Sequence, residues 1–181
     1  MSLLEPDALW QSVQRRLKRP GALGWLLMIP VIGGFGVALA AGIGVRVFDS
    51  EWSTVFGYSA RPDVDGARFR TLWATLALAP LVQGAVGASL LGFYSQPRRW
   101  QAALAVAVVG AVPVYVSGLA LVLLPGIVIV LIGFCVSIVW WAMGAREVLG
   151  VPAPECAEFV VASLTVTGAA LMLFSTLFEM T

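Results

Sequence analysis

Residues 71–148 form a stretch of more than seventy positions in which the only charged residues are Arg98, Arg99, Arg146 and Glu147. Apolar blocks of similar character precede and follow this stretch. The hydrocarbon core of a bilayer is about 30 Å thick, and a helix needs about 20 apolar residues to cross it. The apolar blocks divide into five segments of that length, so the sequence predicts a chain that is embedded in a membrane.

The composition excludes an ordinary water-soluble domain. Hydrophobic residues make up 60% of the chain and charged residues 12%, and the mean hydropathy is +0.92. A soluble domain carries about 25% charged residues. Five spans of about 20 residues each use most of the 181 residues. We therefore expect an all-α fold, a polytopic transmembrane helix bundle with five spans, and no separate soluble domain.

The boundaries of the expected spans follow from the positions of charged and turn-forming residues. Pro125 and Gly126 predict a tight turn between the third and fourth spans, because proline fixes its own dihedral angle and glycine accepts a positive one. Polar or charged residues mark the other boundaries. The predicted membrane domain covers 23–178 and contains the spans 23–47, 71–94, 100–124, 127–148 and 158–178.

The segment 1–22 precedes the first span and is predicted to contain a short amphipathic helix that lies in the membrane interface. Leu9, Trp10, Val13 and Leu17 recur at the spacing of one helix face. A cluster of cations follows, and cations beside a span favour the cytoplasmic side, where they meet anionic lipid headgroups rather than nucleic acid. The residues expected to contact the membrane surface are Trp10, Arg15, Arg16, Lys18 and Arg19.

The distribution of basic residues predicts the orientation of the chain. Arginine and lysine in short flanks resist translocation across the membrane. With a cytoplasmic N-terminus, seven of the eleven basic residues fall on the inner side and four on the outer side. We therefore expect the N-terminus in the cytoplasm and the C-terminus outside.

Small residues recur every four positions on two of the predicted spans. This spacing lets two helix backbones approach closely in lipid. Two interpretations stay open at this point, namely packing within one bundle and an interface between copies of the chain. The residues concerned are Gly36, Ala40 and Gly44 on the first span, and Gly84, Ala88 and Gly92 on the second.

Gln83 is the most informative polar residue within a span. Its side-chain amide stands near the centre of the second span and needs a partner on another helix or water in a groove. Pro80 frees a backbone carbonyl in the preceding turn. Structural hydrogen bonding is one interpretation, and a groove for a lipid or small solute, as in a small transporter or channel, is the alternative. The residues predicted to line such a cavity are Pro80, Gln83, Pro113, Tyr115 and Ser117.

Catalytic chemistry has little support in the sequence. The chain contains no histidine, which removes histidine-ligated haem, histidine metal sites and the usual serine triad. The centres of the predicted spans carry no ionisable residue, which argues against ion coupling. We therefore expect no catalytic residues, no metal and no cofactor, and we predict that the protein is not an enzyme.

Several short motifs follow one another along almost the whole chain. They are Leu3-Leu4-Glu5-Pro6, Ile29-Pro30-Val31-Ile32, Pro113-Val114-Tyr115-Val116-Ser117-Gly118-Leu119, Leu123-Leu124-Pro125 and Glu147-Val148-Leu149-Gly150-Val151-Pro152. In this order they resemble the bacterial branch of the Ypt-interacting protein (Yip) family. The region 48–70 and most of the second span carry no matching motif.

The resemblance to the Yip family implies a topology more than an activity. It implies five spans, a cytoplasmic N-terminus, a C-terminus across the membrane and, for a bacterial member, the inner membrane. Eukaryotic relatives act in vesicle trafficking, associate with prenylated Rab-type GTPases and form oligomers. The resemblance supplies no catalytic residues. We therefore expect a protein that acts through association with membrane lipid, with itself as a homo-oligomer, or with a membrane-protein partner.

Overall fold

The structure is a computed structural model, and it describes residues 6–47, 66–94, 99–120 and 127–179. Within these ranges all regular secondary structure is helical. Five helical segments are long and apolar enough to cross a membrane. The predicted all-α fold with five spans is therefore confirmed.

The five apolar segments match the predicted spans in order and closely in position. They are Ala22–Ala40, Trp73–Tyr94, Trp100–Leu119, Val128–Leu149 and Ala153–Leu173. The last segment begins earlier than the predicted span 158–178, because a helical turn at Ala153–Glu155 already leads into the helix. The turn predicted at Pro125 and Gly126 lies outside the described residues.

Three of the spans, the second, fourth and fifth, combine a longer helix with a short helical extension, and the third span contains two helices, α5 and α6. The elements are α1 (Pro6–Leu17), α2 (Ala22–Val47), α4 (Gly66–Leu90), η1 (Leu91–Tyr94), α5 (Trp100–Gly110), α6 (Val112–Leu119), α7 (Ile127–Gly144), η3 (Ala145–Leu149), η4 (Ala153–Glu155) and α8 (Cys156–Glu179). Here η1 and η4 are 3₁₀ helices, and η3 is a π-helix.

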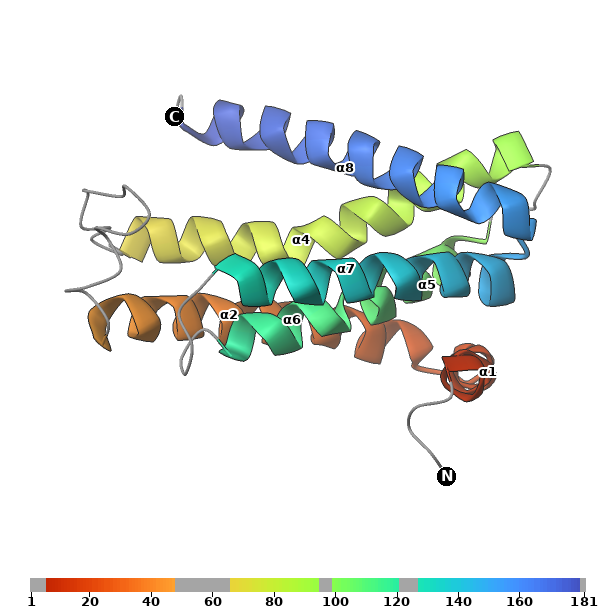
Figure 1. The fold of residues 1–181 in the computed structure, drawn as a ribbon, viewed down its shortest axis with the longest axis horizontal. Coiled ribbons are helices and arrows are strands. Elements are labelled where there is room, and N and C mark those ends of the chain that lie inside the picture. Colours follow the sequence, from red (N-terminus) through yellow and green to blue (C-terminus); the bar gives the residue numbers. More distant parts are fainter. Residues whose placement is uncertain (1–5, 48–65, 95–98, 121–126, 180–181) are drawn as a thin grey trace.

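The spans run side by side along the long axis of the molecule, whereas α1 lies across one end and is seen almost end-on in Figure 1. The C-terminal end of α8 lies at the opposite end of the bundle. Helix α4 contacts α2, α5 and α8, and α6 packs between α2 and α7. This arrangement places α1, the end of α4, the start of α5 and the start of α8 at one face of the predicted membrane.

The third span is one apolar segment, Trp100–Leu119, with a single irregular residue, Ala111, between α5 and α6. Proline has no N–H and cannot continue the hydrogen-bond ladder of a helix. Pro113 therefore leaves the carbonyl four residues earlier without its helical donor, and the chain turns at Ala111 between α5 and α6. The α-helical pattern continues on both sides of Ala111, because its N–H donates to Ala107 O at 3.1 Å and the N–H of Tyr115 donates to Ala111 O at 3.2 Å, each four residues earlier.

Many interior positions of the bundle are occupied by small residues, and many large apolar side chains face outward. Ala38, Ala88, Ala105 and Val108 are completely buried. Large side chains with more than half of their surface exposed occur on all five spans, and examples are Ile32, Phe93, Val116, Ile132 and Met172. An apolar exterior of this extent would aggregate in water but is the ordinary surface of a helix bundle in lipid.

Gly84 permits the closest approach of α4 to α5. A β-carbon at this position would lie 2.8 Å from Leu104 Cα, whereas one at Gly87, a turn further along α4, would meet its nearest atom, Phe159 Cζ, at 3.6 Å. The first contact is with backbone and cannot be relieved by a side-chain rotation. The second is an ordinary van der Waals distance.

We expect Gly84→Ala to lower the free energy of unfolding by about 1–3 kcal/mol, because the added methyl group overpacks the interface with α5. The matched control, Gly87→Ala, should raise it by about 0.5–1 kcal/mol through better helix propensity. Unfolding in mixed detergent micelles measures both values. Equal effects of the two substitutions would contradict the close approach of the backbones.

Candidate functional site

The N-terminal helix α1 is docked on the bundle through its apolar face. Trp10 and Val13 are 1% and 4% exposed. The indole lies against Gly144 at the end of α7, where a β-carbon would stand 2.8 Å from Trp10 Cη2 and 2.9 Å from Val106 Cγ1. The predicted contact of Trp10 with the membrane surface is therefore wrong, because the protein itself covers this side chain.

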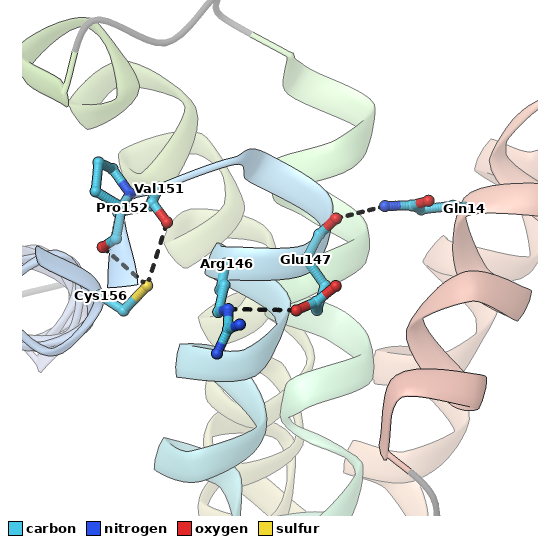
Figure 2. A network of polar contacts seen from close by, with 6 residues as sticks. All are labelled: Gln14, Arg146, Glu147, Val151, Pro152 and Cys156. Carbon is cyan, nitrogen blue, oxygen red and sulfur yellow. Dashed lines mark hydrogen bonds and ion pairs between the residues drawn. The ribbon is translucent and has the colours of Figure 1, made fainter. Parts of the chain in front are cut away.

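A hydrogen bond between α1 and η3 accompanies this apolar contact. Gln14 Nε2 donates to the backbone oxygen of Glu147 (Figure 2). In the π-helix η3, hydrogen bonds span five residues instead of four, and such single turns occur frequently at functional sites. The π-helix ends at Gly150, whose φ of +77° is the left-handed conformation that glycine accepts readily. Gln14 thus ties α1 to an irregular turn at the end of the fourth span.

The cations of the N-terminal segment point away from this contact. Arg15, Arg16, Lys18 and Arg19 are all exposed. Arg146 on η3 is also exposed and forms an ion pair with Glu147, with 3.4 Å between Nε and Oε1 (Figure 2). Helix α1 therefore contacts the protein on one side and presents a positively charged face on the other.

The carbonyl freed by Pro80 has a specific partner on another helix. Proline at 80 removes the helical donor for Leu76 O, and Tyr115 Oη donates to this oxygen at 2.8 Å. The tyrosine ring packs against Gly33, where a β-carbon would lie 2.8 Å from the ring. Residues from α2, α4 and α6 therefore meet in one contact, in which the hydroxyl of Tyr115 replaces a missing backbone donor.

Gln83 lines a small pocket between α4, α5, α7, η3 and α8, with a volume of about 20 Å³. Gln83 is 7% exposed, and it has no hydrogen-bond partner among the described residues. The other lining residues are Gly87, Ala103, Val106, Ala107, Trp141, Leu149, Phe159, Val160 and Ser163.

Four of the five residues predicted to line a cavity lie elsewhere. Pro80 and Tyr115 belong to the contact at Leu76, and Pro113 lies at the start of α6. Ser117 Oγ donates to Val114 O at 2.9 Å within α6 and packs against Gly133 of α7. The pocket at Gln83 therefore does not include the other four residues, and α6, which carries Pro113, Tyr115 and Ser117, packs against α2 and α7.

The sequence did not identify Ser163, Trp141 and Phe159 as neighbours of Gln83. A serine within an apolar span and an aromatic near a span end are visible in the sequence. Which helix they face depends on how α7 and α8 pack, and this information is not local. Trp141 is also anchored by its indole N–H, which donates to Ala107 O at 3.0 Å.

The small-residue stripes mostly face the interior of the same chain. Gly84 approaches α5, and a β-carbon at Gly36 would lie 3.0 Å from Leu119 Cδ2 of α6. Ala40 and Ala88 are buried, whereas Gly92 is exposed. The surroundings of the remaining predicted member, Gly44, lie outside the described residues.

Cys156, at the start of α8, is buried and is enclosed by backbone oxygens. Its Sγ lies 3.5 Å from Val151 O and 3.4 Å from Pro152 O (Figure 2). Within the residues that the structure describes, His, Cys, Asp and Glu do not gather into a group of three that could hold a metal ion. The thiol therefore forms part of the turn that joins η3 to α8.

Tyr115→Phe should lower the free energy of unfolding by about 1–2 kcal/mol, because Leu76 O then loses its donor in an apolar interior. Pro80→Ala restores the backbone donor to that oxygen, so Tyr115→Phe should cost less in the Pro80→Ala background. A double-mutant cycle of unfolding in micelles measures this coupling. Additive effects would show that the hydroxyl does not replace the missing backbone donor.

Trp10→Ala should detach α1 from the bundle, because truncation of a buried tryptophan costs about 3–5 kcal/mol. Hydrogen–deuterium exchange of the amides in 6–17 should then rise, while exchange in the spans stays the same. Trp10→Phe should have a smaller effect, because it keeps an aromatic ring in contact with the bundle. The indole N–H that it removes has no hydrogen-bond partner among the described residues. Unchanged exchange in Trp10→Ala would contradict the docking.

We compared the chain with protein-family models, with curated proteins and with solved structures, and none of them matches it.

Proposed function

We propose that the chain is a non-enzymatic integral membrane protein that binds anionic lipid at one face of the bilayer through α1. The observation that carries this proposal is that the apolar residues of the N-terminal segment contact the bundle while its cations are exposed. Its apolar residues Trp10 and Val13 are used up by contact with the bundle, while the four cations at Arg15, Arg16, Lys18 and Arg19 remain exposed. A positively charged helix held at the membrane surface attracts anionic headgroups.

Lipid is favoured over the other two partners by the packing of the glycine stripes. Gly84 and Gly36 approach helices of their own chain, so these positions are not free to form an interface with a second copy. A homo-oligomer or a membrane-protein partner would have to use other surfaces. The outward faces of the spans carry scattered large apolar residues, which lipid chains cover without a specific partner.

The proposed location is the inner membrane of a bacterium, with α1 on the cytoplasmic side. The described part of the chain supports this orientation, because six of its cations, Arg15, Arg16, Lys18, Arg19, Arg99 and Arg146, belong to the end of the bundle where α1 lies, and three, Arg46, Arg68 and Arg70, belong to the other end. Cytoplasmic flanks of spans carry such an excess. The resemblance to the Yip family supports the same topology and a role in membrane organisation.

Transport of a lipid or solute has weaker support. The pocket at Gln83 has a volume of about 20 Å³, and pockets for small-molecule ligands are typically about 300–1,000 Å³. We therefore place the working surface of the protein at its membrane-facing end rather than in its interior. The absence of histidine from the chain supports the view that binding, and not catalysis, is its activity.

Native mass spectrometry of protein released from nanodiscs of phosphatidylglycerol and phosphatidylcholine tests this proposal. Each cation near an anionic surface contributes about 1 kcal/mol, so the wild-type protein should retain phosphatidylglycerol preferentially. Replacement of all four cations of the N-terminal segment by glutamine should reduce this preference by at least about tenfold, which corresponds to 1.4 kcal/mol.

The matched control exchanges each of the four arginines and lysines for the other basic residue. It preserves charge and should preserve the preference for phosphatidylglycerol. Retention of both lipids in equal amounts by the wild-type protein, or an unchanged preference in the glutamine variant, would refute the role of α1.

A further inference from the structure

The pocket beside Gln83 has features that lipid binding by α1 does not use. It lies within the membrane domain, and its walls are mostly apolar. Three lining residues carry hydrogen-bonding side chains. The indole N–H of Trp141 already donates to Ala107 O, and the other two, Gln83 on α4 and Ser163 on α8, are 7% and 3% exposed. The pocket therefore brings together two almost completely buried polar side chains from different spans.

The hydrogen-bonding capacity of these two side chains is only partly used. Ser163 Oγ donates to Val160 O at 2.9 Å, which leaves its lone pairs as acceptors. The amide of Gln83 offers two N–H donors and one carbonyl acceptor, and it makes no hydrogen bond to another described residue. A buried amide without a partner in an apolar interior is costly. A suitable ligand for this site is therefore a small molecule that can both donate and accept hydrogen bonds.

The pocket has room for a molecule of the size of water. A cavity needs roughly 10–15 Å³ of this kind of volume to hold one water molecule, and the pocket provides about 20 Å³. A buried water also needs two to four polar partners. The Gln83 carbonyl, the Gln83 N–H groups and Ser163 Oγ, all on residues that line the pocket, can supply that number.

We propose that this pocket is a specific water-binding site, in which one ordered water links Gln83 of α4 to Ser163 of α8. The water accepts a hydrogen bond from Gln83 Nε2 and donates hydrogen bonds to Gln83 Oε1 and Ser163 Oγ. It gives α8 a polar connection to α4 in addition to the apolar contacts between the two helices. Gln83 is then a structural hydration residue, not part of a transport path.

Radiolytic footprinting with mass spectrometry on the full chain in nanodiscs tests this site. Hydroxyl radicals formed from a bound water modify the side chains beside it even when bulk solvent cannot reach them. Trp141 lines the pocket and is 5% exposed, whereas Trp10 is 1% exposed and is not among the lining residues. Trp141 should therefore be oxidised at least several-fold faster than Trp10.

Two substitutions should remove this difference. Gln83→Leu deletes the main partner of the water, and Ser163→Ala deletes the second partner with a smaller change in volume, so the test holds if the first variant folds poorly. Ser89→Ala is the matched control, because Ser89 lies on α4, is exposed and bonds to Ala85 O of its own helix. It should leave the oxidation of Trp141 unchanged.

Two results would overturn the proposal. One is equally slow oxidation of Trp141 and Trp10 in the wild-type protein, which would mean that no water is held beside Trp141. The other is fast oxidation of Trp141 that persists in both Gln83→Leu and Ser163→Ala, which would mean that the two polar side chains do not hold the water.

Discussion

Every polar group of the backbone must find a partner inside the protein when no water surrounds it, and this constraint governs the structure of the spans. Proline in a span leaves one backbone carbonyl without its helical donor. The structure shows two outcomes of this loss. At Pro80 the helix continues, and Tyr115 from another span donates to the freed oxygen of Leu76. Near Pro113 the helix is interrupted at one residue, Ala111, between α5 and α6. Helices α4 and α6 are joined at Leu76, where the hydrogen-bond ladder of α4 lacks a donor.

The spans could be predicted because hydropathy is a local property that the sequence displays directly. A window of about 20 apolar residues identifies a span without any knowledge of its neighbours. The irregular residue Ala111 in the third span was not predicted although Pro113 was visible, because proline can also be tolerated within a membrane helix, as Pro30 and Pro80 are here. Local sequence does not decide between these outcomes.

The site residues were harder to predict, because their roles depend on which helices meet. Amphipathic spacing identified the buried face of α1, but it could not distinguish lipid from protein as the covering medium, and Trp10 proved to be covered by Gly144 and Val106. Gln83 was identified from its polarity alone. Its neighbour Ser163 lies eighty positions further along the chain, and only the packing of α8 on α4 brings the two together.

The packing of Trp10 against the bundle also has a consequence for the order in which the protein assembles. Helix α1 precedes the spans in the sequence, yet it contacts α5, α7 and η3, which lie much later in the chain. Helix α1 can therefore complete these contacts only after the third and fourth spans have packed. Docking of α1 therefore indicates that the bundle is packed, and release of α1 indicates that the packing at this end of the bundle is lost.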